Sequence, residues 1–160
     1  FMAINGPIAG IGLCFAVFGD FRYMADGAKL TTAFAKRGLI AEHGISWMLP
    51  RLIGTMNALD LLCSARTVDA AEAERMGLVR KLPFEGFLAH VLHIAQEMTA
   101  TASPRSIAVI KRQVWRTHFQ SLAEAWGDAD VEMKKSFASE DFKEGVAHFV
   151  EKRAPAFTGR

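Results

Sequence analysis

The segment at residues 3–12 reads Ala-Ile-Asn-Gly-Pro-Ile-Ala-Gly-Ile-Gly, and a further apolar run follows it as far as Phe18. Apolar residues that enter a glycine-rich turn predict a strand at residues 2–5, and the run after the turn predicts a short helix at residues 10–19. Because that helix is apolar on every face, we expect it to be buried. The apolar stretch has about eleven residues and two internal glycines, whereas a membrane span needs about twenty. The segment therefore predicts a strand, a turn and a helix inside a globular fold.

Three glycines in this turn, Gly6, Gly10 and Gly12, raise three hypotheses. A dinucleotide-binding loop needs the spacing G-x-G-x-x-G, and Phe15 stands where the third glycine belongs, so the spacing argues against a nucleotide. The glycines can serve packing alone, since they let a strand and a helix approach closely. Alternatively, the free peptide N–H groups at the start of the helix form a site for an anion or an oxyanion.

The rest of the chain changes character at its midpoint. Up to residue 82, short strands alternate with short helices, a pattern typical of α/β folds. We expect strands at 21–24, 29–34 and 78–82 and helices at 44–49, 57–63 and 70–76. The helix at 44–49 should stop or kink near Pro50. From Glu85 onward apolar residues recur at helical spacing only, with helix starts at Ser103-Pro104, Ser121 and Ser139.

Composition excludes several classes of protein. The chain has 160 residues, of which 51% are hydrophobic and 22% charged, as is typical of a globular protein. A net charge of +2 is too small to hold a nucleic-acid backbone, so we expect no nucleic-acid partner. The apolar stretch near the N-terminus is too short for a membrane span, so we expect no membrane partner. Two cysteines, Cys14 and Cys63, favour a reducing compartment and hence a cytoplasmic location. His90 and His93 have no third ligand near them in the sequence, so we expect no metal site.

Glu42 and His43 lie in a loop bounded by Gly38 and Gly44, with apolar residues on both sides. Two interpretations stay open at this point. Glu42 could cap the helix expected from Gly44, because a carboxylate is favourable at a helix N-terminus. It could also serve as a general base or acid, because a carboxylate among apolar side chains is suited to proton transfer near neutral pH, although from the residues alone capping is the favoured interpretation. Cys14, within an apolar run, is expected to be a core residue rather than a nucleophile.

Several short segments, taken together and in their order along the chain, form a pattern that can be compared with known families. They are residues 3–12 with Gly19-Asp20, Arg-Gly-Leu-Ile-Ala-Glu-His-Gly at 37–44, Leu-Pro-Arg-Leu-Ile-Gly at 49–54, residues 68–73 with Gly77-Leu78-Val79, and residues 139–145 with 149–153. This series resembles the crotonase superfamily, the enoyl-CoA hydratase/isomerase family, over nearly the whole chain.

The resemblance implies an α/β fold: the C-terminal portion of a crotonase-like ββα spiral, at residues 1–98, followed by an all-helical C-terminal trimerisation region at residues 99–160. It implies a homotrimer or a dimer of trimers. In the family the Asn-Gly-Pro strand follows several earlier ββα units, so the chain is expected to be the second part of a larger domain.

The resemblance also implies a chemistry. Family members bind an acyl-CoA thioester as substrate, without a tightly bound cofactor, and stabilise an enolate with two peptide N–H groups, one of which corresponds to Ile11. The two glutamates of the hydratases align with Cys14 and Phe34, which cannot activate water. Glu42 matches the single catalytic glutamate of several isomerases, and Lys152 matches a lysine that contacts the CoA nucleotide of a neighbouring subunit. We therefore expect an isomerase-like enzyme with Glu42 as its proton shuttle. The two alternatives are a 2-enoyl-CoA hydratase, which is a lyase, and a non-catalytic CoA-binding protein with a crotonase fold.

Overall fold

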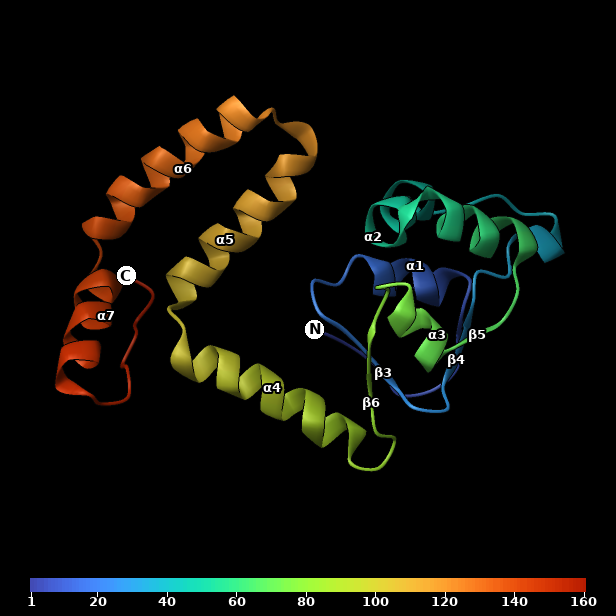
Figure 1. Ribbon diagram of the computed structural model, residues 1–160, viewed down its shortest axis with the longest axis horizontal. Helices are drawn as coiled ribbons and strands as arrows, with labels where there is room; N and C mark the ends of the chain where they lie inside the picture. Colours follow the sequence, from blue (N-terminus) through green and yellow to red (C-terminus); the bar gives the residue numbers. More distant parts are fainter. The chain divides into compact units, whose positions relative to one another are not determined.

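Short strands of two to four residues form two small sheets in the first part of the chain (Figure 1). The strands β1 (Met2–Ile4), β3 (Arg22–Ala25) and β6 (Arg80–Leu82) make a parallel sheet in that order, with Ile4 opposite Met24 and Met24 opposite Lys81. The second sheet has the order β2 (Ile8–Ala9), β4 (Lys29–Thr31), β5 (Val68–Asp69). Here β2 and β4 are parallel, and β4 and β5 are antiparallel.

The computed structural model describes all residues, 1–160, and the chain divides into two units, Phe1–His93 and Ile94–Arg160. The helical segments of the first unit are α1 (Ile11–Val17), the 3₁₀ turn η1 (Ala35–Arg37), α2 (Ile45–Leu59), the π-helical η2 (Asp60–Ser64) and α3 (Ala70–Arg75). Its core is formed by fully buried side chains that come from both sheets and the helices, among them Leu13, Met24, Leu30, Ile45, Leu49 and Leu78.

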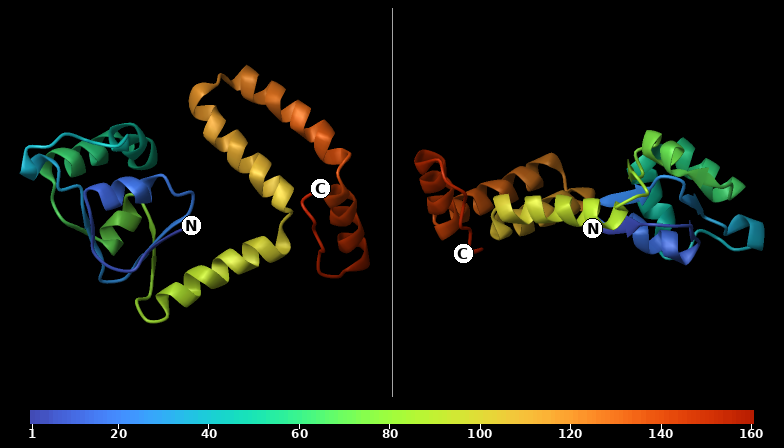
Figure 2. Two further views of the ribbon diagram at one scale, coloured as in Figure 1. Left: turned by 180° about the vertical axis from the view of Figure 1, so that it is seen from behind. Right: turned by 90° about the horizontal axis from the view of Figure 1, so that it is seen from below.

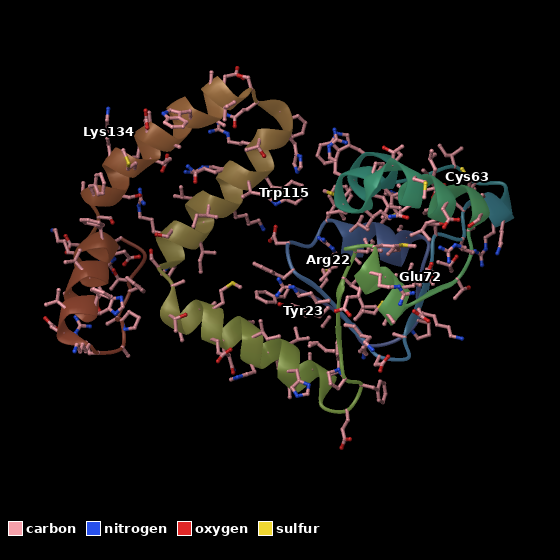
Figure 3. All side chains as sticks on the ribbon, viewed as in Figure 1. Arg22, Tyr23, Cys63, Glu72, Trp115 and Lys134 are labelled. Atoms are coloured by element: carbon pink, nitrogen blue, oxygen red, sulfur yellow. The ribbon has the colours of Figure 1, made fainter.

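Arg22 ties three parts of the first unit together. Its guanidinium donates to the carbonyl of Gly19, just after α1, at 2.6 Å and to that of Leu78, just before β6, at 2.7 Å. Arg22 and the buried Tyr23 are neighbours on β3 (Figure 3). These two bonds hold the end of α1 against the sheet that contains β3.

Helices alone make up the second unit. After α4 (Phe87–Thr101), which runs across the boundary between the units, come α5 (Pro104–Arg116), the 3₁₀ turn η3 (Thr117–Phe119), α6 (Leu122–Phe137) and α7 (Glu140–Glu151). The chain reverses at η3, so α5 and α6 lie side by side in opposite directions (Figures 1 and 2). Serine side chains cap all three of the last helices, namely Ser103, Ser121 and Ser139, as the sequence predicts.

Three expectations about the first unit are wrong. The helix α1 is only half buried, because Ile11, Phe15 and Phe18 form a stripe that is exposed to solvent. The helix α2 continues past Pro50 and has its break at Gly54, where φ is 77° and ψ is 159°, a conformation that is open to glycine and costly for other residues. The strand β5, with two residues, was not expected, and β4 ends at Thr31 rather than at residue 34.

Candidate functional site

An open pocket of about 320 Å³ lies beside the start of α1 and the loop that precedes α2. Its lining includes Gly10, Ile11, Phe34, Arg37, Leu39 and Glu42. The structure thus brings together two of the three residues that sequence reasoning selects, Ile11 and Glu42. Both come from segments that contain glycines with positive φ.

The Ile11 wall of the pocket is the first turn of α1. Gly10 precedes it with φ 52° and ψ −122°, a combination that side chains with a Cβ strongly disfavour, and its N–H donates to the carbonyl of Thr31 at 3.2 Å. The first N–H that bonds back along the helix is that of Cys14, which donates to the carbonyl of Gly10 at 3.1 Å. The N–H of Ile11 lies before that bond, among the helix-start donors that have no intrahelical acceptor.

A tight turn holds Glu42 at the pocket. His43 and Gly44 both have left-handed backbones, with φ 51° and 75°, and the turn leads directly into α2. The carbonyl of Glu42 accepts the N–H of Ile45 at 3.1 Å and the thiol of Cys14 at 3.6 Å, which links the loop to α1. These backbone contacts fix the position of Glu42 without using its carboxylate.

The carboxylate of Glu42 does not cap α2. The N-cap residue is Gly44, and no side chain accepts a hydrogen bond there. The carboxylate lies 3.8 Å from Nε2 of His43, and 35% of the Glu42 side chain is exposed. The capping interpretation is therefore wrong, and the carboxylate is left available at the pocket.

Cys14 and Phe34 fit the roles of core residues. Cys14 is buried, as expected, and the pKa of its thiol is raised by burial and by the negative charge of Glu42. Phe34 is also buried and contributes an apolar wall to the pocket. Glu42 is consequently the one carboxylate among the residues that line this pocket.

Arg37 is a pocket residue that sequence reasoning missed. It ends η1, and its guanidinium donates to the carbonyl of Ala33 at 3.4 Å. No ion pair joins it to Glu42 although both line the pocket. The available signal was its place at the start of the glycine-bounded loop, but a basic residue in a loop is usually a solvated one.

Lys152 lies in the second unit and does not line the pocket. It is the C-cap residue of α7, with a left-handed backbone (φ 52°), and its N–H donates to the carbonyl of His148. Its exposed ammonium group is free to meet an anion from solvent.

Two further features, a metal site and a membrane-spanning helix, are not supported by the structure. His90 and His93 lie exposed on α4, and nowhere do three or more histidine, cysteine or acidic side chains gather as metal ligands. None of the helices combines the length and the apolar character that crossing a membrane would require.

The sequence of the chain is similar to a known protein family and to several of its members. The family model described as enoyl-CoA hydratase/isomerase matches residues 2–160. The chain is 38% identical to the probable enoyl-CoA hydratase echA12 of Mycobacterium tuberculosis, over 98% of this chain and 56% of that protein. It is 30% identical to the 1,2-epoxyphenylacetyl-CoA isomerase of Escherichia coli, over 99% of this chain and 60% of that protein.

A solved structure agrees with the fold as well. The crystal structure of a probable enoyl-CoA hydratase/isomerase from Mycobacterium abscessus superposes with a TM-score of 0.94 at 30% identity, over 99% of this chain and 65% of that one. The chain thus spans about three fifths of the length of these relatives. The matched family model and the shared α/β fold with C-terminal helices lead to one conclusion: this chain belongs to the enoyl-CoA hydratase/isomerase family, the crotonase superfamily.

Proposed function

We propose that the protein acts on acyl-CoA thioesters through an enolate, with Glu42 as the proton shuttle and the Ile11 N–H as an oxyanion donor. The observation that carries this proposal is the pocket of about 320 Å³ that Ile11 and Glu42 line together. A hydrogen-bond donor and a base on residues of one pocket are the two groups that enolate formation needs.

The proposed reaction is the conversion of a 3-enoyl-CoA to a 2-enoyl-CoA. The Glu42 carboxylate removes a proton from C2, and the electron pair moves onto the thioester oxygen to give a dienolate. The Ile11 N–H donates a hydrogen bond to that oxygen, where the negative charge develops. Glu42 then returns the proton to C4, the electron pair leaves the oxygen, and the double bond forms between C2 and C3.

Isomerisation is favoured over hydration because of the residues at Cys14 and Phe34. Hydration needs a second group that holds and activates water, and a buried thiol and a phenyl ring cannot do so. The relatives include both a probable enoyl-CoA hydratase and an isomerase, so a 2-enoyl-CoA hydratase stays the first alternative. A CoA-binding protein without turnover is the second alternative, because the pocket holds a single carboxylate.

We further propose that Lys152 contacts the CoA nucleotide and that the helices at residues 99–160 form a trimer or a dimer of trimers. An exposed ammonium group is suited to a phosphate. Large apolar side chains on α5, α6 and α7 lie open to solvent, among them Val114, Leu122, Trp126 and Phe149, and such surfaces mark sites of association. The cytoplasmic location stays a prediction, and it rests on two free cysteines.

Product analysis tests these alternatives against one another. The protein is incubated with a 3-enoyl-CoA and, separately, with a 2-enoyl-CoA, and the products are identified by chromatography. We expect 2-enoyl-CoA from the first substrate and little 3-hydroxyacyl-CoA from the second. Rapid formation of 3-hydroxyacyl-CoA would favour the hydratase, whereas heat of CoA binding without any product would favour the non-catalytic protein.

A further inference from the structure

The second unit contains a basic pocket of about 480 Å³ between α5 and α6, and neither Ile11, Glu42 nor Lys152 lines it. Its lining includes Pro104, Arg105, Arg112, Glu132, Lys135 and Gly159. We propose that this pocket binds the phosphate group of a small molecule.

Positive charge exceeds negative charge in this pocket. Glu132 is the one acidic side chain of the lining, and three cations surround it. Lys135 Nζ lies 3.0 Å and Arg112 Nη2 lies 3.3 Å from Oε1 of Glu132, and Arg105 Nη2 lies 3.8 Å from Oε2. The hydrogen bond from Lys135 and the charges of the two arginines hold the pKa of Glu132 below its ordinary value, so the carboxylate stays ionised. Three positive charges less one negative charge leave an excess of two.

Two side chains of this charged cluster, Arg105 and Glu132, are mostly buried, and the other two, Arg112 and Lys135, face solvent. The side chains of Arg105 and Glu132 are only 19% and 17% exposed, whereas those of Arg112 and Lys135 are 50% and 60% exposed. Ser136 joins the inner pair, since its hydroxyl accepts from Arg105 at 2.8 Å and donates to the carbonyl of Glu132 at 2.9 Å. Glu132 therefore holds Arg112 and Lys135 in place while their remaining N–H groups can meet a ligand.

The chemistry of these groups fits a phosphate better than a single carboxylate. A phosphate monoester carries close to two negative charges near neutral pH, which matches the excess of two in the pocket. A guanidinium has five N–H donors in a fixed plane, and only part of those of Arg112 are directed at Glu132. Pro104 and Arg105 belong to the first turn of α5, whose helix dipole adds a favourable field for an anion.

The test is a calorimetric titration of the protein at constant ionic strength with two probes, inorganic phosphate and, separately, ADP. The double variant R112Q/K135Q removes both solvent-facing cations. The matched control is K134Q, which removes the neighbouring lysine on α6, an exposed residue outside the pocket (Figure 3). If the double variant does not fold, as judged by thermal melting, K135Q alone replaces it.

For each probe we expect the same dissociation constant with the wild-type protein and with K134Q. The affinity of R112Q/K135Q should be at least about tenfold lower, because hydrogen bonds to charged groups are lost. Binding of ADP but not of inorganic phosphate would also support the site if R112Q/K135Q weakens it, and it would identify a nucleotide as the source of the phosphate; ADP held by Lys152 alone would bind the double variant unchanged. The proposal is overturned if neither probe binds, or if K134Q and R112Q/K135Q bind with the same affinity. Neither outcome depends on enzymatic turnover, so the site and the acyl-CoA activity are tested separately.

Discussion

At the scale of single residues, the proposed mechanism depends on one peptide N–H, that of Ile11, which a substitution can remove. Ile11 is the first residue of α1, the position at which proline is best tolerated in a helix. We expect Ile11→Pro to lower kcat/KM by about 10²- to 10³-fold, the usual effect of losing one oxyanion donor. The melting temperature should change little, and a steady-state assay beside a thermal melt measures both quantities.

Ile11→Val is the matched control, because it changes the exposed side chain and keeps the N–H. It should retain nearly the full rate. Equal rates for the proline and valine variants, with both folded, would remove Ile11 from the mechanism.

The turn that carries Glu42 gives a second prediction at this scale. At Gly44, φ is 75°, and an added Cβ would lie 3.2 Å from Cζ of Phe18. Gly38 has a similar φ of 70° but an added Cβ there would meet nothing within 4 Å. We expect both alanine variants to lose about 1 kcal/mol of unfolding free energy through backbone strain. Gly44→Ala should lose more, and it alone should lower the rate, because it displaces the loop from α1.

Urea unfolding of the two alanine variants measures this difference directly. If Gly38→Ala and Gly44→Ala lose the same stability and the same activity, the contact with Phe18 does not position Glu42.

At the level of single residues, the sequence correctly indicated the pocket residues that lie in glycine-containing turns. The glycines around Ile11 and Glu42 pointed to special turns, and the two residues do line one pocket. Their catalytic roles stay predictions. Arg37 was missed because nothing in a single sequence distinguishes a basic loop residue in solvent from one that lines a cavity.

At the scale of elements, α7 is fastened to the chain that follows it by its acidic side chains. Arg153 pairs with Glu144, which also accepts the N–H of Ala156 at 2.7 Å. The bond with Arg153, followed by the bond with Ala156, lowers the pKa of Glu144 to about 2. Buried Asp141 acts similarly, since it accepts from Ser103 and from the N–H groups of Thr158 and Gly159.

The lowered pKa of Glu144 predicts a dependence of stability on pH. In the unfolded chain this carboxyl takes up its proton near its ordinary pKa of 4.5, and in the folded chain only near 2. The unfolded state thus binds more protons between these values, so stability rises with pH there and is lost as pH falls from about 4.5 toward 2. Thermal melts of wild type and Glu144→Gln across this range should show a shallower fall for the variant.

Glu140→Gln is the control, because Glu140 pairs with Lys143 at the exposed surface, where an ion pair adds little. A pH profile of Glu144→Gln that coincides with those of wild type and the control would contradict the role of the Glu144 pair.

The sequence predicted the starts of helices well where a local capping motif determines them. Serine followed by an acidic or proline-containing first turn correctly marked the starts of α5, α6 and α7. Proline was a poor guide in α2, because the helix tolerates the lost bond at Pro50 and breaks instead at Gly54. The exposed stripe of α1 could not be foreseen, because a helix that is apolar all round does not reveal which face its own chain covers.

At the scale of the whole molecule, association is the main prediction. Trp126 on α6 is 67% exposed, and a large aromatic side chain of this kind is typical of the centre of an interface. We expect the wild-type protein to elute as a trimer or a hexamer in size-exclusion chromatography with light scattering. Trp126→Asp should shift the population toward the monomer, because it places a charge in the proposed interface. A wild-type monomer at high concentration would contradict the proposed assembly.

The sequence predicted the family and the division into an α/β part and a helical part, because the motifs recur in order over nearly the whole chain. It could not predict the basic pocket between α5 and α6. Arg105, Arg112 and Lys135 read as solvated residues on helices. Lys135 is one helical turn from Glu132 on α6, but only the antiparallel packing of α5 and α6 brings Arg105 and Arg112 to Glu132.

The most direct test of the central claim is proton transfer by Glu42, measured by NMR of a 3-enoyl-CoA in deuterium oxide. We expect the protein to form 2-enoyl-CoA with deuterium entering at C4 or C2, and Glu42→Gln to slow this by about 10²- to 10⁴-fold. Glu85→Gln, an exposed glutamate outside the pocket, should retain the wild-type rate. Deuterium incorporation and isomerisation at the wild-type rate in Glu42→Gln would show that another group moves the proton.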